Sequence, residues 1–176
     1  LVDAGADANK QDENGLTALM YTAQDGGEHA TRMMRLLVDA GADVNMGDKY
    51  KITVLMMSAK YGGKHAAGMM RLLLNAGADA NKQDENGWTA LMIAAEHGGE
   101  HGAAMMRLLV DAGADGNKQN KDGQTALMIA AEHGDKHGAG MMRLLLDAGA
   151  DANKQSEDGS TALILAARHA DEHAVR

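Results

Sequence analysis

Two short segments contain the residue types from which a hydrolytic zinc site could be built. Residues 97–101 read His-Gly-Gly-Glu-His, and residues 169–173 read His-Ala-Asp-Glu-His. In zinc hydrolases with this spacing, two imidazoles on one helical face bind the metal, a third ligand completes the site, and the glutamate acts as the base. Such a site requires a continuous helix through the histidine pair.

The neighbouring residues argue against this chemistry. Gly98 and Gly99 separate the first pair and favour the end of a helix. The related segment 133–137 reads His-Gly-Asp-Lys-His and lacks the glutamate. One histidine of each pair also belongs to a series spaced by 36 residues, which duplication alone produces: His29, His65, His101, His137 and His173. We therefore predict no catalytic residue and no resident metal. Loop capping is the preferred role of the histidines, and adventitious metal binding is the alternative.

Two further patterns have a structural interpretation. Segment 79–87 places acidic or amide groups at alternate positions, but a calcium loop needs glycine at its sixth position and glutamate at its twelfth. Asp84 and Ala90 hold those positions, so a hydrogen-bonded turn is expected. Methionines recur in pairs and could line an adaptable binding groove. Their register with leucines predicts core packing instead. The pairs are Met33-Met34, Met69-Met70, Met105-Met106 and Met141-Met142.

The composition describes an acidic chain without cysteine. The 176 residues carry a formal charge of -8, whereas binding to phosphate backbones needs a clustered basic surface. Nucleic acid is therefore not expected as a partner. The sequence has no apolar run of about 18 residues that would span a membrane. The lack of cysteine excludes disulfides and favours an intracellular, cytoplasmic location. No cofactor is expected.

The tripeptide Gly-Ala-Asp recurs with an unbroken spacing of 36 residues. Its copies begin at Gly5, Gly41, Gly77, Gly113 and Gly149. A fixed period of this length is typical of solenoids, in which each unit buries its apolar face against its neighbours. Such arrays usually present an extended surface rather than a catalytic pocket.

Each unit is predicted to contain a turn and two helices. In the reference unit 81–116, the polar segment 81–87 predicts a turn, and Thr89 occupies the position of a helix N-cap. Residues 90–96 are helix formers and predict a short first helix. A stripe of apolar residues with helical spacing then predicts a second helix, which ends at Gly113.

This pattern resembles the ankyrin repeat, and the resemblance covers the whole chain. The matching residues of the reference unit and its successor are Asp84, Gly87, Thr89, Leu91, Ala94, Ala95, Gly98, Leu108, Leu109, Gly113, Ala114, Asp115 and Asn117. The resemblance implies an all-α, ankyrin-like solenoid of helix-loop-helix units joined by β-turn, hairpin-like loops. It also implies a non-enzymatic scaffold that binds another protein on its concave surface.

The chain departs from the family pattern in three ways. Thr89 begins the tetrapeptide Thr-Ala-Leu-Met, where the family has Thr-Pro-Leu-His. The period exceeds the family's, which is about 33 residues, and the three extra residues fall in segment 99–104, as a longer loop or an extra turn on the second helix. Neither end forms a polar capping unit, so we expect a fragment of a longer array with flanking repeats or further domains. The expected divisions are a partial unit 1–8, units one to four (9–44, 45–80, 81–116 and 117–152) and a partial unit five (153–176).

Positions that vary between units indicate where a partner would bind. Large apolar residues occur before the N-cap threonine, at the loop tip and at the end of the first helix, and only in units one to three. Exposed apolar groups gathered in one patch usually mark an interaction site, and Trp and Tyr are favoured anchors. The predicted partner-binding residues are Leu16, Tyr50, Ile52, Tyr61 and Trp88. Tyr21 is expected to pack within the helices instead.

Three functions remain open from the sequence. The leading prediction is a protein-binding scaffold centred on unit two, which diverges most: Lys51 replaces the glycine of the other units, and Met46-Gly47 replaces Lys-Gln. The alternative is a regulatory or targeting segment of a larger enzyme, channel or effector. A zinc hydrolase built on the histidine pairs is the third.

Overall fold

The computed structural model describes residues 5–97, 99–133 and 137–174, without the side chains of 133 and 169–174. The helices are α1 (Ala18–Asp25), α2 (Ala30–Asp39), α3 (Val54–Tyr61), the short 3-10 helix η2 (Gly63–His65), α4 (Ala66–Asn75), α5 (Ala90–His97), α6 (Gly99–Asp111), α7 (Ala126–His133), α8 (Gly138–Asp147) and α9 (Ala162–Ala174). The described part of the chain contains no strand, apart from an isolated antiparallel bridge between Gly47 and Thr53.

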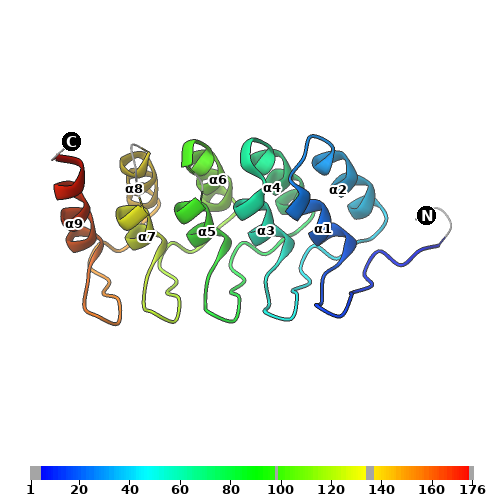
Figure 1. The fold of residues 1–176 in the computed structure, drawn as a ribbon, viewed down its shortest axis with the longest axis horizontal. Coiled ribbons are helices and arrows are strands. Elements are labelled where there is room, and N and C mark those ends of the chain that lie inside the picture. Colours follow the sequence, from blue (N-terminus) through cyan, green and yellow to red (C-terminus); the bar gives the residue numbers. More distant parts are fainter. Residues whose placement is uncertain (1–4, 98, 134–136, 175–176) are drawn as a thin grey trace.

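The helices form two parallel rows along the length of the molecule (Figure 1). The first row contains α1, α3, α5, α7 and α9, and the second contains α2, α4, α6 and α8. Each helix packs on its neighbours in the same row, and the helices of units one to four also pack on the paired helix of their own unit. Long loops project together from one side of the rows. We call these loops fingers; they comprise residues 10–16, 46–52, 82–88, 118–124 and 154–160. The architecture is a solenoid, as the period predicts, and its all-α character agrees with what the resemblance implies.

Each helix of the first row begins at a buried or half-buried threonine. In unit three, the Thr89 hydroxyl accepts a hydrogen bond from the Met92 amide at 3.2 Å, which satisfies one of the four amides that lack a partner within the helix. The same bond forms at Thr17, Thr53, Thr125 and Thr161. The N-cap predicted at Thr89 is therefore confirmed, and the Pro of the family pattern is not needed to start the helix.

The Gly-Ala of the recurring tripeptide ends the second helix of each unit. Gly41 has a φ of 85°, a left-handed conformation that glycine adopts without strain. Its amide donates to the carbonyl of Val38 at 2.9 Å, and the next amide, of Ala42, donates to the carbonyl of Leu37 at 3.0 Å. This pair of bonds is a Schellman motif, which satisfies carbonyls at the helix end.

The Asp of the tripeptide and the Asn two residues later join successive units. The Asn9 side chain donates to the carbonyl of Gly41 at 3.1 Å and accepts from the amide of Asp43 at 2.7 Å. Asn45, Asn81 and Asn117 repeat both bonds with the next unit. The recurring tripeptide thus ends one helix and receives the bridge from the preceding unit.

The three inserted residues adopt different structures in different units. Unit two forms η2 between its helices, whereas in unit three the second helix, α6, starts at Gly99 and extends over 13 residues. The extra turn that we considered from the sequence is therefore present in unit three. The first helix of that unit ends at His97, as the two glycines predict.

The core follows the two helix rows through the described units. The methionine pairs contribute to it as predicted: Met34, Met69, Met70, Met105, Met106 and Met141 are buried. Met33 was wrongly assigned to the core, because its side chain is 50% exposed whereas the equivalent Met69 is fully buried. Met69 is covered by the packing of α4 against α2, and no described helix packs on the other side of α2.

Candidate functional site

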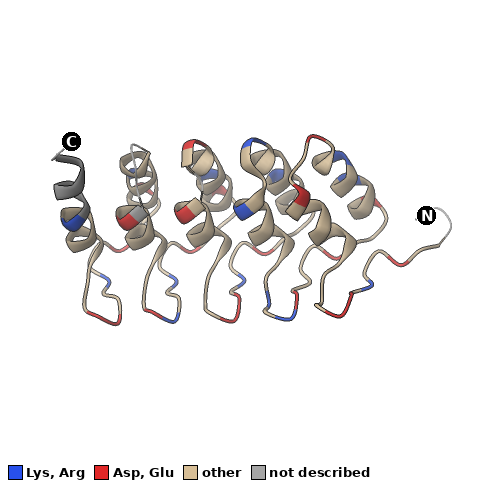
Figure 2. Cartoon of the chain, in the orientation of Figure 1, with Lys and Arg blue, Asp and Glu red and all other residues tan. Residues whose placement is uncertain are grey.

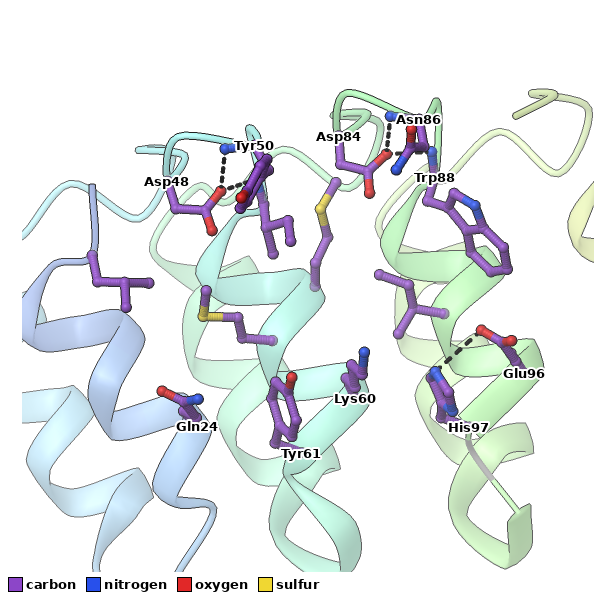
Figure 3. A pocket seen from close by; sticks show the side chains of 15 residues that line it. Gln24, Asp48, Tyr50, Lys60, Tyr61, Asp84, Asn86, Trp88, Glu96 and His97 are labelled. Atoms are coloured by element: carbon purple, nitrogen blue, oxygen red, sulfur yellow. Dashed lines mark hydrogen bonds and ion pairs between the residues drawn. The ribbon is translucent and has the colours of Figure 1, made fainter. Parts of the chain in front are cut away.

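A groove of about 420 Å³ lies between the fingers and the first-row helices of units one to three (Figure 3). We call it the aromatic groove. All five predicted partner-binding residues line it: Leu16, Tyr50, Ile52, Tyr61 and Trp88. Their common location is a finding of the structure, whereas their role in binding stays a prediction.

The floor of the groove is apolar. Leu16 and Ile52 each precede an N-cap threonine, and both are half-buried against the core. Met56, Met57 and Ile93 from α3 and α5 complete the floor. Met56 and Met57 are 1% and 7% exposed. An apolar floor with a few polar groups around it is typical of binding sites.

Aromatic side chains lie at the margins of the groove. Tyr50 is 52% exposed at the tip of its finger, and Tyr61 is 45% exposed at the end of α3. Trp88 is half-buried before α5, at the end of the groove away from Tyr61 (Figure 3). Two lysines lie over the tyrosine rings: the Lys49 ammonium is 5.2 Å from the centroid of Tyr50, and the Lys60 ammonium is 5.5 Å from that of Tyr61. At these distances the rings attract the cations.

Hydrogen bonds within the fingers position Tyr50 and Trp88. The Asp48 carboxylate accepts from the amides of Tyr50 and Ile52 at 2.9 and 2.8 Å. The Asp84 carboxylate accepts in the same way from Asn86 and Trp88, both at 2.8 Å. Asp side chains that accept from amides two residues further on stabilise tight turns.

Neighbouring fingers are also joined through their backbones. The amide of Glu85 donates to the carbonyl of Tyr50 at 2.9 Å, and the amide of Lys121 donates to the carbonyl of Asn86 at 2.8 Å. The hydrogen bond from Glu85 to Tyr50 fixes the distance between the tips of fingers two and three. It therefore pre-organises the side chains of Tyr50 and Trp88 for binding.

Polar residues that the sequence analysis did not assign to the site complete the margin. They are Gln24, Asp48, Lys60, Asp84, Asn86, Glu96 and His97. Glu96 and His97 lie at the end of α5, where the imidazole is 3.1 Å from the Glu96 carboxylate. Ile93 and Met57 were missed as well, because helical periodicity assigns them to the core. Both residues lie four positions after an N-cap threonine. That shared position was the sequence feature that could have assigned them to the site.

The expectation that Tyr21 packs within the helices is wrong. Its side chain is 49% exposed, and its hydroxyl donates to the Asp12 carboxylate at 2.7 Å. Tyr21 is the unit-one equivalent of Met57 and Ile93, so it lies on the same face as the aromatic groove. The Tyr21 hydroxyl, and after it the Leu16 amide, lower the pKa of Asp12 below its ordinary value of 3.8.

The structure separates the histidines of the first zinc-like segment onto two helices. His97 is the last residue of α5, whereas His101 lies in α6, where its imidazole is 3.2 Å from the Glu100 carboxylate. Within the described residues, no three His, Asp or Glu side chains are grouped as metal ligands. The side chains of His133, His169 and His173 lie outside the described part of the structure.

Comparison with known families agrees with the geometry. The family model described as ankyrin repeats (3 copies) matches residues 1–84, 27–101, 64–154 and 100–176, which together span the sequence. A search of curated proteins finds no significant match. Among the described residues, no helix is long and apolar enough to cross a membrane. Repeats of this type are generally protein-protein interaction modules. The two helix rows, the projecting fingers and the matches along the whole sequence lead to one conclusion: the chain belongs to the ankyrin repeat family.

Proposed function

We propose that this protein is a non-enzymatic scaffold that binds a segment of another protein in the aromatic groove. The observation that carries the proposal is the meeting of two exposed tyrosines and a tryptophan around an apolar hollow of about 420 Å³. Units four and five have polar residues at the positions of Trp88 and Tyr50. This difference between the units favours units one to three as the binding surface.

The chemistry of the groove favours a partner segment with a large apolar side chain. Such a side chain would cover Ile52, Met57 and Ile93, and burial of apolar surface contributes about 25 cal/mol per Å². Tyr50 and Trp88 provide wide contact areas at a low cost in side-chain entropy, which is why such residues often dominate binding energies. Lys60 and Glu96 would contact polar groups of the same segment at the margin.

The experiment is a measurement of affinity for a partner captured with the native protein. The double variant Tyr50→Ala, Trp88→Ala should bind at least about tenfold more weakly, since truncation of anchor residues typically costs 2 kcal/mol or more, roughly. The matched control is Gln124→Ala, which truncates the residue at the Trp88 position of unit four, outside the groove. Isothermal titration calorimetry would provide the three dissociation constants.

Folding of each variant must be checked, because Trp88 also packs on the core. Circular dichroism and urea unfolding would identify a folded fraction, and a second variant, Tyr50→Ala alone, alters only an exposed finger tip. Equal affinities of the wild type and the folded double variant would reject the groove as the binding site.

A further inference from the structure

A second groove, of about 500 Å³, lies on the helices of the second row. It shares no residue with the aromatic groove. Its sides come from α4, α6 and α8, and small residues keep the floor open: Ala67, Ala103, Ala104 and Gly140. We call it the arginine groove, because three of its lining residues are arginines at the same position of successive units.

The three arginines are Arg71, Arg107 and Arg143, and all are exposed. Arg143 is paired with Asp147 one helical turn further on, with 3.2 Å between the guanidinium and the carboxylate. The guanidinium groups of Arg71 and Arg107 make no hydrogen bond or ion pair with any described residue. Their five N–H donors each are therefore directed at solvent, and exposed pairs such as Arg143–Asp147 are weak enough for another carboxylate to compete with them.

Unit two differs from the other units at this surface as well. Asn75 occupies the position held by Asp39, Asp111 and Asp147, so Arg71 has no carboxylate one turn away. The lining of the groove contains three arginines against two aspartates, an excess of one positive charge on a chain whose formal charge is -8. Arg71 and Asn75 also line an adjoining hollow of about 400 Å³, which extends the same surface.

We propose that the arginine groove is a second protein-binding surface, which takes carboxylate side chains of an acidic partner segment between Arg71 and Arg107. Planar guanidinium groups bind carboxylates through two parallel hydrogen bonds, which gives direction as well as charge. The repeat sets these groups at regular intervals, a geometry that suits an extended segment with several acidic residues. The arginine groove would bind its partner independently of the aromatic groove.

Charge complementarity decides the kind of partner. The acidic residues of the rest of the molecule repel a polyanion, so any attraction must be local to this groove. In Figure 2 both signs of charge occur along the fingers. Salt should weaken binding, because exposed charges are screened over about 10 Å at 0.1 M ionic strength.

The test uses fluorescein-labelled decaglutamate and fluorescence anisotropy at low ionic strength. The double variant Arg71→Gln, Arg107→Gln should weaken binding by at least about tenfold. Asn75→Asp should weaken binding as well, about two- to fivefold. The new carboxylate would lie one helical turn from Arg71 and would compete with the ligand for its guanidinium group. The matched control is Arg35→Gln, which removes an arginine at the same helical position outside the groove and should change binding less than about twofold.

Four other outcomes would overturn the proposal. Equal weakening by Arg35→Gln would show that binding follows net charge and would overturn the proposal, as would unchanged binding by the double variant or absence of binding by the wild type. Binding of a phosphoserine peptide without binding of decaglutamate would overturn it too, since the ligand would then be a phosphate group. The variant Trp88→Ala should bind decaglutamate normally, which separates this surface from the aromatic groove.

Discussion

Lys51 has a backbone φ of 63°, and it is the non-glycine residue with a positive φ among those that the structure describes. The other units place Gly15, Gly87, Gly123 and Gly159 here, with φ values of 73° to 80°. For residues with a Cβ atom, the left-handed region costs roughly 1–2 kcal/mol. Unit two therefore keeps a strained residue directly after Tyr50 in its finger.

Replacement of this lysine by glycine should stabilise the protein. We expect Lys51→Gly to raise the free energy of unfolding by about 0.5–1 kcal/mol, because relief of the strain outweighs the greater backbone entropy of glycine. Urea unfolding followed by circular dichroism measures this change. The opposite exchange, Gly87→Ala, should destabilise, since its Cβ would lie 2.9 Å from the Asn120 Cα. An unchanged midpoint for Lys51→Gly would contradict the assigned strain.

The hydrogen bond between Tyr21 and Asp12 should be visible in the pKa of the carboxyl group. Tyr21→Phe removes the largest cause of the lowered pKa, so the pKa of Asp12 should rise towards 3.8 in an NMR titration. Because the folded pKa is lowered, its stabilising effect is present above pH 3.8 and is lost as the pH falls through the folded value. Tyr50→Phe is the control, and an equal shift there would contradict the assignment.

At the scale of the elements, two ladders of side chains join the units. The Asn ladder runs through four successive junctions, whereas the glutamine ladder is interrupted. Gln83 donates to the carbonyl of Gly87 at 2.7 Å and to that of Gln119 in the next finger at 3.1 Å. Unit two has Gly47 at this position, and a hollow of about 230 Å³ lies between fingers two and three. The aromatic groove thus spans the junction that lacks one of the two ladders.

The Asn ladder should contribute measurably to stability. Asn81→Ala removes a donor to Gly113 at 2.8 Å and an acceptor for the Asp115 amide at 2.7 Å, so we expect a loss of about 1–3 kcal/mol. Asn153→Ala is the matched control, because its side chain makes no bond to a described residue, and its cost should be a few tenths of a kcal/mol, roughly. Urea unfolding would compare both with the wild type, and equal costs would refute the bridging role.

At the scale of the whole molecule, burial depends on a unit's place in the stack. Leu127 in α7 is 2% exposed, whereas its unit-five equivalent, Leu163 in α9, is 77% exposed. Leu127 lies under α9, which packs on α7, and no described helix covers the other face of α9. Equivalent positions in different units therefore contribute differently to the free energy of unfolding. This is expected for a solenoid, in which each unit is stabilised by contacts with its immediate neighbours.

This dependence on place leads to a paired prediction. Leu127→Ala should cost about 2–5 kcal/mol, the usual range for a buried leucine, and Leu163→Ala should cost less than about 1 kcal/mol. Thermal unfolding of both variants would measure the difference. Similar costs for the two substitutions would mean that the apolar face of α9 is covered in solution.

Most of the fold could be predicted from the sequence, because its determinants are local. Thr89 caps a helix through an amide three residues away, and Gly113 ends one through carbonyls within the preceding turn. Such contacts recur wherever the same residues recur. Met33 and Tyr21 could not be predicted correctly, because their exposure depends on which helices lie beside them.

The candidate site shows the same division. Variation between units identified Leu16, Tyr50, Ile52, Tyr61 and Trp88, and the structure places all five around one groove. Met57, Ile93 and Glu96 belong to that groove only through the stacking of units two and three.

The sequence by itself therefore determined the period, the caps, the fingers and the positions that diverge, since these depend on residues close together in the chain. The tertiary structure alone decided which apolar side chains stay exposed, which polar ones share the aromatic groove, and that three arginines line a second groove. Those properties arise where separate units meet, and their physical origin is the packing between neighbours rather than the residues of one unit.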